Sequence, residues 1–462
     1  MRLPFVSSWL SEFAAWQKSS TEAERKDQRV FDSLQAVRRK QRKSNNNTML
    51  YKGLTNMFMV YVAFGLALIN SAHALSVHGL KTLVVYDNRV NDLEDYSSFF
   101  DSLKRRSYDI EFASVNNDTE KIKLYEGDTR LVDNLIIFPI KGRQIHKDIT
   151  VKSLLRFFEE GGDILTVTSP AGLPDAIRIF TNQLGIYPSP KDNHLLDYFQ
   201  RSSDVIEIPT SQIKNKYVFS PEKESTLVYK GSAALLDNNE LIVPVLPAPR
   251  TSFTKNLKKK EEWVIGSQGY TIAGFQNLHN SRATWAGSDL FFSNENYSSN
   301  GEFIEELTKW TFREKAVVKS TGVEHSHADG ASYEELPYKV KDSVTYKIGL
   351  SEWNGEQWVP FIADDVQFEL KMIDPYYRLT LNLSRKTEDS QYYTTGRFDL
   401  PDHHGVFTFL TDYKRTGLSF VTEKDVKAIR HLANDEYSRS WEITNAWVYL
   451  TSIYAVIFAW VL

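Results

Sequence analysis

The residue types that most often bind metals gather in one short stretch of this chain. His325, His327 and Asp329 alternate with other residues, so on an extended segment they share one side and offer metal ligands. The surrounding sequence supplies too few further ligands to close such a site. We therefore favour a solvent-exposed loop between two domains over a metal centre.

Ser169 is a second candidate, because it follows an apolar run in the place of a strand-to-helix nucleophile. A nucleophile elbow requires glycine two residues before and two residues after the serine, and Val167 and Ala171 occupy these positions. The chain has no cysteine, which excludes disulfides, thiolate metal ligands and cysteine nucleophiles. It also lacks a P-loop, and a glycine-rich dinucleotide fingerprint is absent after its first strand. We expect no catalytic residue, metal or cofactor.

The elements that position these residues begin with an α/β pattern. Between residues 81 and 185, apolar strand-like runs alternate with amphipathic helical patterns. Gly161 and Gly185 follow two of the predicted helices, in the place where glycine ends a helix. Strands that alternate with helices at this spacing predict a parallel sheet with right-handed crossovers.

The pattern changes after residue 200. Residues 200–300 carry irregular strand-like runs, among them 216–220, and an amphipathic helix is predicted over 301–314. These residues complete an α/β domain over 75–315 whose second half is β-rich. From 316 to 440, segments of period-2 alternation are separated by turn signals, which predicts an antiparallel β-sandwich of six or seven strands.

The beginning of the chain carries a targeting signal. Residues 49–74 combine a positive flank at Lys52, a short apolar run and a small-x-small site that ends at Ala74. This order predicts a secretory signal peptide that is cleaved after Ala74. Residues 1–48 precede it and are expected to be a disordered leader or a gene-model extension.

The end of the chain is apolar as well. Residues 443–462 contain no charged side chain, and a helix of this length spans about 30 Å, the thickness of a bilayer's hydrocarbon core. We predict a single C-terminal transmembrane helix, with residues 75–440 on the lumenal side. Because Lys or Arg is expected on the cytosolic side of such a span, we expect the natural chain to continue beyond Leu462.

Three sequons lie in the predicted lumenal part. Asn117, Asn296 and Asn382 each begin an Asn-x-Ser/Thr acceptor for N-glycosylation. The formal net charge of the chain is −4. This value argues against nucleic acid as a partner, because binding to phosphate backbones requires an excess of Lys and Arg.

Several blocks of the sequence, in order, resemble one known family. TLVVYDNRVNDLEDYSSFFDSLKRRSYDIEF, LVDNLIIFP and FFEEGGDILTVTSP in the first body resemble the 48-kDa, WBP-type subunit of the oligosaccharyltransferase, the dolichyl-diphosphooligosaccharide–protein glycosyltransferase. DDVQFELKMIDPYYRLTL and LPDHHGVFTFLTDYKRTGLSF in the second body agree with it. LGIYPSPKDNHLLDYF and AIRHLANDEYSRSWEI resemble its fungal branch. The resemblance covers about residues 80–462.

The resemblance implies a non-catalytic subunit of a complex for protein N-glycosylation in the endoplasmic reticulum. That complex moves a preassembled glycan from dolichyl diphosphate to the Asn of Asn-x-Ser/Thr in nascent proteins, and a separate multispanning subunit is catalytic. The resemblance further implies a single-pass type I membrane glycoprotein with an amidotransferase-like α/β domain. Its partners would be small membrane subunits and the catalytic subunit. For the span it implies close packing at four small residues: Ala446, Ser452, Ala455 and Ala459.

Two other functions stay open from the sequence. A vestigial amidotransferase-like enzyme on the α/β domain would need Ser169 as its nucleophile, because the chain offers no cysteine. A lumenal glycan-binding module would stack sugars on aromatic rings, for which Trp353, Trp358 and Tyr376 are candidates. Labelling of Ser169 by a serine-reactive probe or binding of oligosaccharide would favour one of these.

Overall fold

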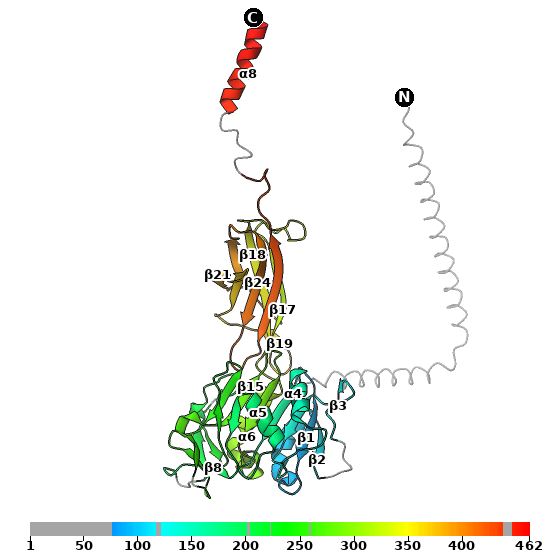
Figure 1. Ribbon diagram of the computed structural model, residues 1–462, viewed down its shortest axis with the longest axis vertical. Helices are drawn as coiled ribbons and strands as arrows, with labels where there is room; N and C mark the ends of the chain where they lie inside the picture. Colours follow the sequence, from blue (N-terminus) through cyan, green and yellow to red (C-terminus); the bar gives the residue numbers. More distant parts are fainter. Residues whose placement is uncertain are drawn as a thin grey trace, which may run out of the picture. The chain divides into compact units, whose positions relative to one another are not determined.

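The computed structural model describes residues 76–116, 122–200, 204–221, 223–256, 258–259, 261–437 and 446–462 (Figure 1). The chain divides into two units, Met1–His73 and Ala74–Leu462, and every described residue belongs to the second unit. The predicted leader over 1–48, the predicted signal peptide over 49–74 and the sequon residue Asn117 lie outside the described residues.

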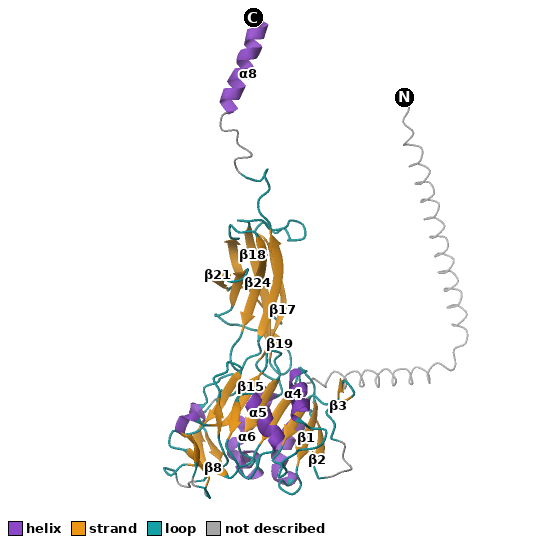
Figure 2. Ribbon diagram, in the orientation of Figure 1, coloured by secondary structure: helices purple, strands orange, loops and turns teal. Residues whose placement is uncertain are grey.

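A nine-stranded sheet forms the α/β body (Figure 2). Its parallel part consists, in spatial order, of β2 (Asp109–Ser114), β1 (Lys81–Tyr86), β5 (Asn134–Ile137), β6 (Asp163–Val167) and β16 (Arg282–Ala286). Its antiparallel part continues with β15 (Tyr270–Gln276), β11 (Ala234–Leu236) and β7 (Ile186–Pro188), and with β12 (Ile242–Pro247) paired to β15. The predicted parallel sheet is confirmed, and the β-rich second half of this body supplies the antiparallel strands.

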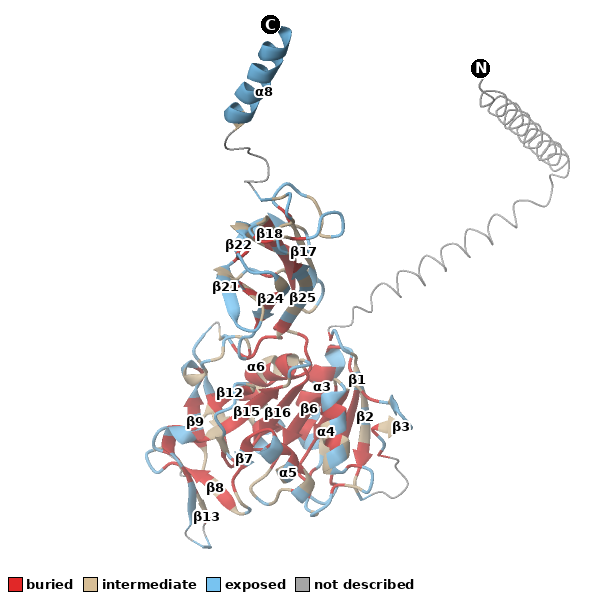
Figure 3. Ribbon diagram, turned by 45° about the horizontal axis from the view of Figure 1, so that its top comes forward, coloured by how far each residue is buried: buried red, intermediate tan, exposed pale blue. Residues whose placement is uncertain are grey.

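Helices cover both faces of this sheet. Side chains along a strand alternate between the two faces, so each face has its own core. One face carries the 3-10 helix η1 (Leu93–Tyr96), α3 (Ser97–Arg105) and α6 (Asn294–Thr311), and the other carries α4 (Val151–Glu159) and α5 (Asp175–Gln183) (Figure 3). Val84 of β1 belongs to the core under α3 and α6. Its neighbours Leu83 and Val85 belong to the core under α4 and α5. Strand β1 is therefore buried on both sides.

The helix ends follow from local sequence. The side chains of Thr150 and Ser153 cap the start of α4 reciprocally. Gly161, with φ of 98°, and Gly185, with φ of 80°, end α4 and α5 in the left-handed conformation, as predicted. Helix α6 begins at Asn294, earlier than predicted. Its first turns are polar and carry no apolar periodicity, so the sequence pattern did not indicate them.

Small sheets and turns complete the α/β body. The strands are β3 (Tyr125–Glu126) with β4 (Thr129–Arg130), β9 (Ile206–Pro209) with β10 (Thr226–Tyr229), and β8 (Asn193–Leu196) with β13 (Phe253–Asn256) and β14 (Glu262–Ile265). The short 3-10 helices are η2 (Thr210–Gln212), η3 (Gly266–Gln268) and η4 (Leu290–Phe292). The predicted strand over 216–220 is wrong. Asn215 forms a turn there, with its side-chain oxygen accepting from the N–H of Tyr217 at 3.0 Å.

The second body is an antiparallel sandwich of two sheets. One sheet contains β17 (Val317–His327), β18 (Ser343–Trp353), β19 (Trp358–Pro360), β22 (Asn382–Lys386) and β23 (Gln391–Asp399). The other contains β20 (Gln367–Lys371), β21 (Pro375–Thr380), β24 (Gly405–Tyr413) and β25 (Val421–Ile429). The described strands exceed the predicted six or seven, partly because the buried Leu381 divides one run into β21 and β22, which join different sheets. The rings of Tyr346 and Phe368 meet between the sheets, with centroids 4.4 Å apart.

Helix α8 (Ala446–Val461) is the last described element; none of its residues is buried, and all from Trp447 onward are exposed. None of the helices in the described part of the chain combines the length and the apolarity that crossing a bilayer demands. The predicted transmembrane helix over 443–462 is therefore not confirmed by the described residues.

Candidate functional site

Open α/β sheets bind ligands at the carboxyl ends of their parallel strands. In this chain a buried aspartate lies at that edge. Asp87 follows β1, and its side chain is 0% exposed. Its carboxylate accepts hydrogen bonds from the backbone N–H and guanidinium of Arg89, from the backbone N–H of Lys141 and from the amide of Asn116. Burial acts to raise the pKa of Asp87, but these hydrogen bonds outweigh burial and hold its pKa well below the usual range. The carboxylate of Asp87 thus connects the loops that follow β1, β2 and β5.

Ser169 lies at a tight turn after β6. It forms an isolated β-bridge with Gly172, and it is half-buried. The cavity beside it measures about 10 Å³, which is room for about one water molecule. This cavity is therefore too small to hold a substrate carbonyl group.

His325 and His327 lie in strand β17, so the predicted loop is wrong at these two residues. The Nε2 atom of His325 is 2.7 Å from the carboxylate of Asp425, and its Nδ1 atom is 2.8 Å from the hydroxyl of Tyr338. The Nε2 atom of His327 hydrogen-bonds to the carbonyl of Leu336 at 2.8 Å. The carboxylate of Asp329 accepts from the backbone N–H of Ala331 at 3.2 Å. No group of three metal-ligating side chains is present among the described residues.

A short loop of the sandwich makes contacts with the α/β body. This junction loop, residues 416–420, is part of the connection from β24 to β25. Trp310 donates through its indole N–H to the carbonyl of Gly417 at 2.7 Å. The side-chain amide of Gln276 donates to the carbonyl of Leu418 at 2.8 Å. Asn280 exchanges two hydrogen bonds with the backbone of the last loop residue, at 2.7 and 3.0 Å. Side chains of α6, of β15 and of the turn after β15 thereby satisfy the backbone of a loop from the other body.

Arg282 is a buried side chain that donates several hydrogen bonds at this contact. It begins β16, is 0% exposed, and donates to the carbonyls of Trp310, Lys315 and Ala316 at 2.7, 2.9 and 2.6 Å. It also donates to the hydroxyl of Ser419, at 3.3 Å. A planar guanidinium with five donors suits such a set of oxygens, because each carbonyl needs a partner when buried. Arg282 was not among the residues predicted from the sequence; its one signal there is a charged residue at the start of an apolar run.

A second buried arginine stands beside it. Arg313 donates to the carboxylate of Asp163 at 2.7 Å, and both side chains are nearly inaccessible. The same carboxylate accepts from the backbone N–H of Arg282 at 2.9 Å. Asp163 therefore neutralises charge at the junction between β6, β16 and the end of α6.

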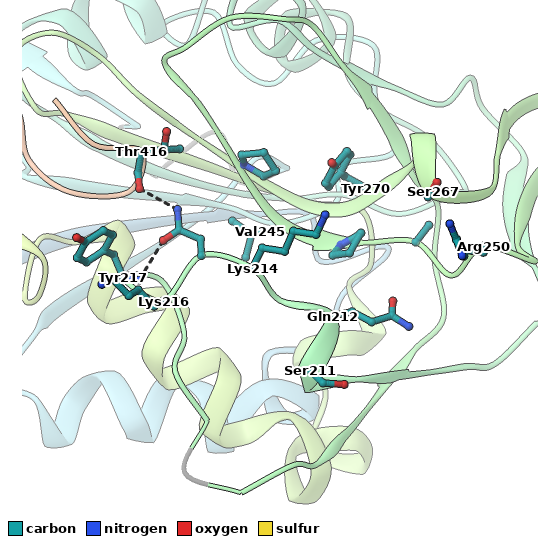
Figure 4. A pocket seen from close by; sticks show the side chains of 14 residues that line it. Ser211, Gln212, Lys214, Lys216, Tyr217, Val245, Arg250, Ser267, Tyr270 and Thr416 are labelled. Atoms are coloured by element: carbon teal, nitrogen blue, oxygen red, sulfur yellow. Dashed lines mark hydrogen bonds between the residues drawn. The ribbon is translucent and has the colours of Figure 1, made fainter.

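A hollow of about 980 Å³ opens next to the junction loop (Figure 4). The turn over 211–217, strand β12, Tyr270 and Thr416 line it. Asn215 fixes the turn to the junction loop, because its amide donates to the carbonyl of Thr416 at 3.0 Å. Three cationic side chains also line the hollow: Lys214, Lys216 and Arg250. The described residues that line it include no acidic side chain, and we call it the cation pocket.

The sequon residues differ in accessibility. Asn382 is exposed at the start of β22, an edge strand. Asn296 lies in the first turn of α6, half-buried, and its amide donates to the carbonyl of Leu290 at 2.8 Å.

The aromatic candidates for sugar binding do not form one platform. Trp353 and Trp358 pair across β18 and β19, with ring centroids 5.3 Å apart, and the amino group of Lys319 lies 3.7 Å from the ring centroid of Trp358. Tyr376 belongs to β21 of the other sheet and contacts the ring of Phe407.

In α8, helical spacing separates the four small residues. At about 100° per residue, Ser452, Ala455 and Ala459 lie within about 60° of one another, and Ala446 lies about 120° from Ser452. Three of the four therefore share one stripe.

A mixed α/β sheet with a parallel part, in contact with an antiparallel sandwich, defines a two-domain protein of the α/β plus β class. The chain belongs to the OST48 family: residues 73–314 match the OST48 N-terminal domain and residues 325–462 match the OST48 middle domain.

Among its relatives is the dolichyl-diphosphooligosaccharide–protein glycosyltransferase subunit WBP1 of Saccharomyces cerevisiae. It is 54% identical over 383 residues, covering 82% of this chain and 89% of the relative. The corresponding subunit of Schizosaccharomyces pombe is 31% identical, covering 80% and 88%. These relatives confirm the resemblance to the fungal branch. A solved structure, the mmIFT52 N-terminal domain, has a TM-score of 0.36 at 14% identity and covers 50% of this chain and 96% of that domain. That score is too low to carry a conclusion.

Proposed function

We propose that this chain is a non-catalytic subunit of the oligosaccharyltransferase complex and acts in its assembly and stability. The complex transfers a preassembled glycan from dolichyl diphosphate to Asn of Asn-x-Ser/Thr. The match to both OST48 domains carries this proposal. The engagement of Asp87 and His325 in internal hydrogen bonds supports an accessory role. Its proposed partners are small membrane subunits and the multispanning catalytic subunit.

We further propose a single-pass type I topology in the membrane of the endoplasmic reticulum. Residues 49–74 would be the signal peptide, 75–315 and 316–440 the two lumenal domains, and 443–462 the span. The hydroxyl of Ser76 is buried and donates to the carbonyl of Phe312 at 2.9 Å. This supports cleavage after Ala74, because a residue two positions after that site packs into the α/β body.

The assembly proposal is tested in yeast cells depleted of their own WBP1. We expect this chain to restore glycosylation of a reporter glycoprotein and to co-purify with the catalytic subunit. A Ser169→Ala variant serves as the control for chemistry, and we expect full rescue by it. A chain that purifies alone and leaves the reporter underglycosylated would contradict the proposal.

The topology is tested separately. Sequencing the mature N-terminus is expected to give Leu75 as the first residue, and protease added to sealed microsomes is expected to spare residues 75–440. Replacement of Ser452, Ala455 and Ala459 by leucine is expected to weaken co-purification of small membrane subunits, because bulky side chains prevent close helix approach. Ala446→Leu is the matched control, since Ala446 lies off that stripe. Equal loss in both variants would argue against the packing surface.

A further inference from the structure

We propose that the cation pocket binds a phosphorylated ligand. Lys214, Lys216 and Arg250 line one hollow, and no described lining residue carries a negative charge. By contrast, the exposed Lys258 outside the pocket has an acidic partner, Asp192, at 3.6 Å. A pocket of one charge sign raises the local concentration of ligands of the opposite sign. This inference does not rest on the proposed function.

The donors of the pocket are free to bind. Within the described part of the chain, Lys214 and Arg250 have no ion-pair or hydrogen-bonding partner for their side chains, and Lys216 contacts only the ring of Tyr217, at 5.2 Å. Three neutral donors are equally available: Ser211, Gln212 and Ser267. Hydroxyl, amide, ammonium and guanidinium groups are together the donors that phosphate oxygens accept from.

The frame of the pocket is fixed, although its cations are exposed. The Asn215 amide holds the turn that carries Lys214 and Lys216. On the opposite side, Gly266 has φ of 60°, and a Cβ there would lie 2.9 Å from the carbonyl oxygen of Arg250. Figure 4 shows Arg250 and Ser267 at the end of the pocket away from Lys216 and Tyr217. A ligand that meets all three cations must therefore extend along the pocket.

Charge and size together select the ligand class. A single carboxylate is matched by one cation, whereas phosphate esters and diphosphates carry two or more charges and match several. A volume of about 980 Å³ falls within the usual range of small-molecule sites, about 300–1,000 Å³, and exceeds what a bare phosphate fills. The flat rings of Tyr217 and Tyr270 border the same space and can pack against an organic body. The ligand is therefore a phosphorylated organic molecule, either free or as a lipid headgroup.

The experiment measures binding to the purified full chain in detergent by calorimetry. Inorganic diphosphate is the first probe, and citrate is the carboxylate probe of similar charge. We expect saturable binding of diphosphate that weakens with salt, and weaker binding of citrate. The Lys214→Ala/Arg250→Ala variant is expected to lose affinity by about tenfold or more, because charge-assisted hydrogen bonds are removed. The matched control is Lys258→Ala/Lys259→Ala, which removes two exposed lysines outside the pocket.

A lipid probe separates the two sources of phosphate. Short-chain phosphatidic acid, with phosphatidylcholine of the same chain length as the control lipid, is titrated into the detergent-solubilised wild-type chain and the pocket variant. Binding that requires phosphatidic acid and is lost in the pocket variant assigns a lipid headgroup; diphosphate binding without binding of phosphatidic acid assigns a free ligand. Absence of saturable diphosphate binding, equal binding of citrate, or equal loss in the pocket and control variants would overturn the proposal. Thermal melting of each variant verifies that the fold is intact.

Discussion

The indole N–H of Trp310 donates a 2.7 Å hydrogen bond to the carbonyl of Gly417, which stands 107 residues further along the chain. Trp310 belongs to the last turn of α6, and Gly417 belongs to the junction loop of the sandwich. Both partners of this bond are removed from water, since Trp310 is 0% exposed. The bond thus couples the core of the α/β body to the backbone of the second body.

Trp310→Phe is expected to lower the free energy of unfolding by about 1–3 kcal/mol. The substitution keeps an aromatic ring but leaves the carbonyl of Gly417 without its donor, and an unpaired buried acceptor costs about that much. Urea unfolding of the full chain followed by circular dichroism measures the change. Trp263→Phe is the control, because Trp263 is 47% exposed, and it is expected to change stability by less than about 0.5 kcal/mol. Similar losses in both variants would show that the bond to Gly417 contributes little.

Asp163→Asn is expected to be more damaging, by about 3–5 kcal/mol. It keeps the shape of the side chain but leaves the guanidinium of Arg313, otherwise 2.7 Å from a carboxylate, buried without a counter-charge. The same unfolding experiment applies. Asp128→Asn is the matched control: Asp128 pairs with Arg156 at 3.1 Å on the surface, and its loss is expected to change stability little. A near-neutral Asp163→Asn variant would contradict the role of this ion pair.

Asp87 predicts a specific response to acid. Its pKa in the folded chain lies below the unfolded value of about 3.9, so the folded state holds the carboxylate ionised more strongly than the unfolded state does. The stabilisation is fully present above about pH 4 and is lost as the pH falls through the folded pKa. Melting temperatures of the wild type and of Asp87→Asn, measured from pH 6 downward, are expected to converge below about pH 4. Curves that stay parallel would exclude this contribution.

Asn382 is expected to carry an N-linked glycan, because it is exposed at the start of edge strand β22 and offers its amide to solvent. Asn382→Gln is expected to remove one glycan, seen as a faster gel band that matches partial deglycosylation of the wild type. A glycan on this edge would also block pairing with other strands. An unchanged band would show that the sequon is unused.

Local patterns predicted the elements of the α/β body well. The alternation of apolar runs and amphipathic segments predicted its parallel strands, and Gly161 and Gly185 predicted two helix ends, because these features depend on neighbours within a few residues. The same reasoning placed His325 and His327 in a loop, although they lie in β17. There, Asp425, which is 100 residues away, supplies a partner that no local pattern reveals.

The sequence by itself determined the family, the two-body order and the positions of most strands and helices, because hydrophobic periodicity and family resemblance are written along the chain. Only the tertiary structure decided the junction and the cation pocket. Arg282 reaches Ser419, and Asn215 reaches Thr416, over separations of 137 and 201 residues. Such contacts depend on how strands and loops meet in space, and they leave no period in the sequence from which they could be read.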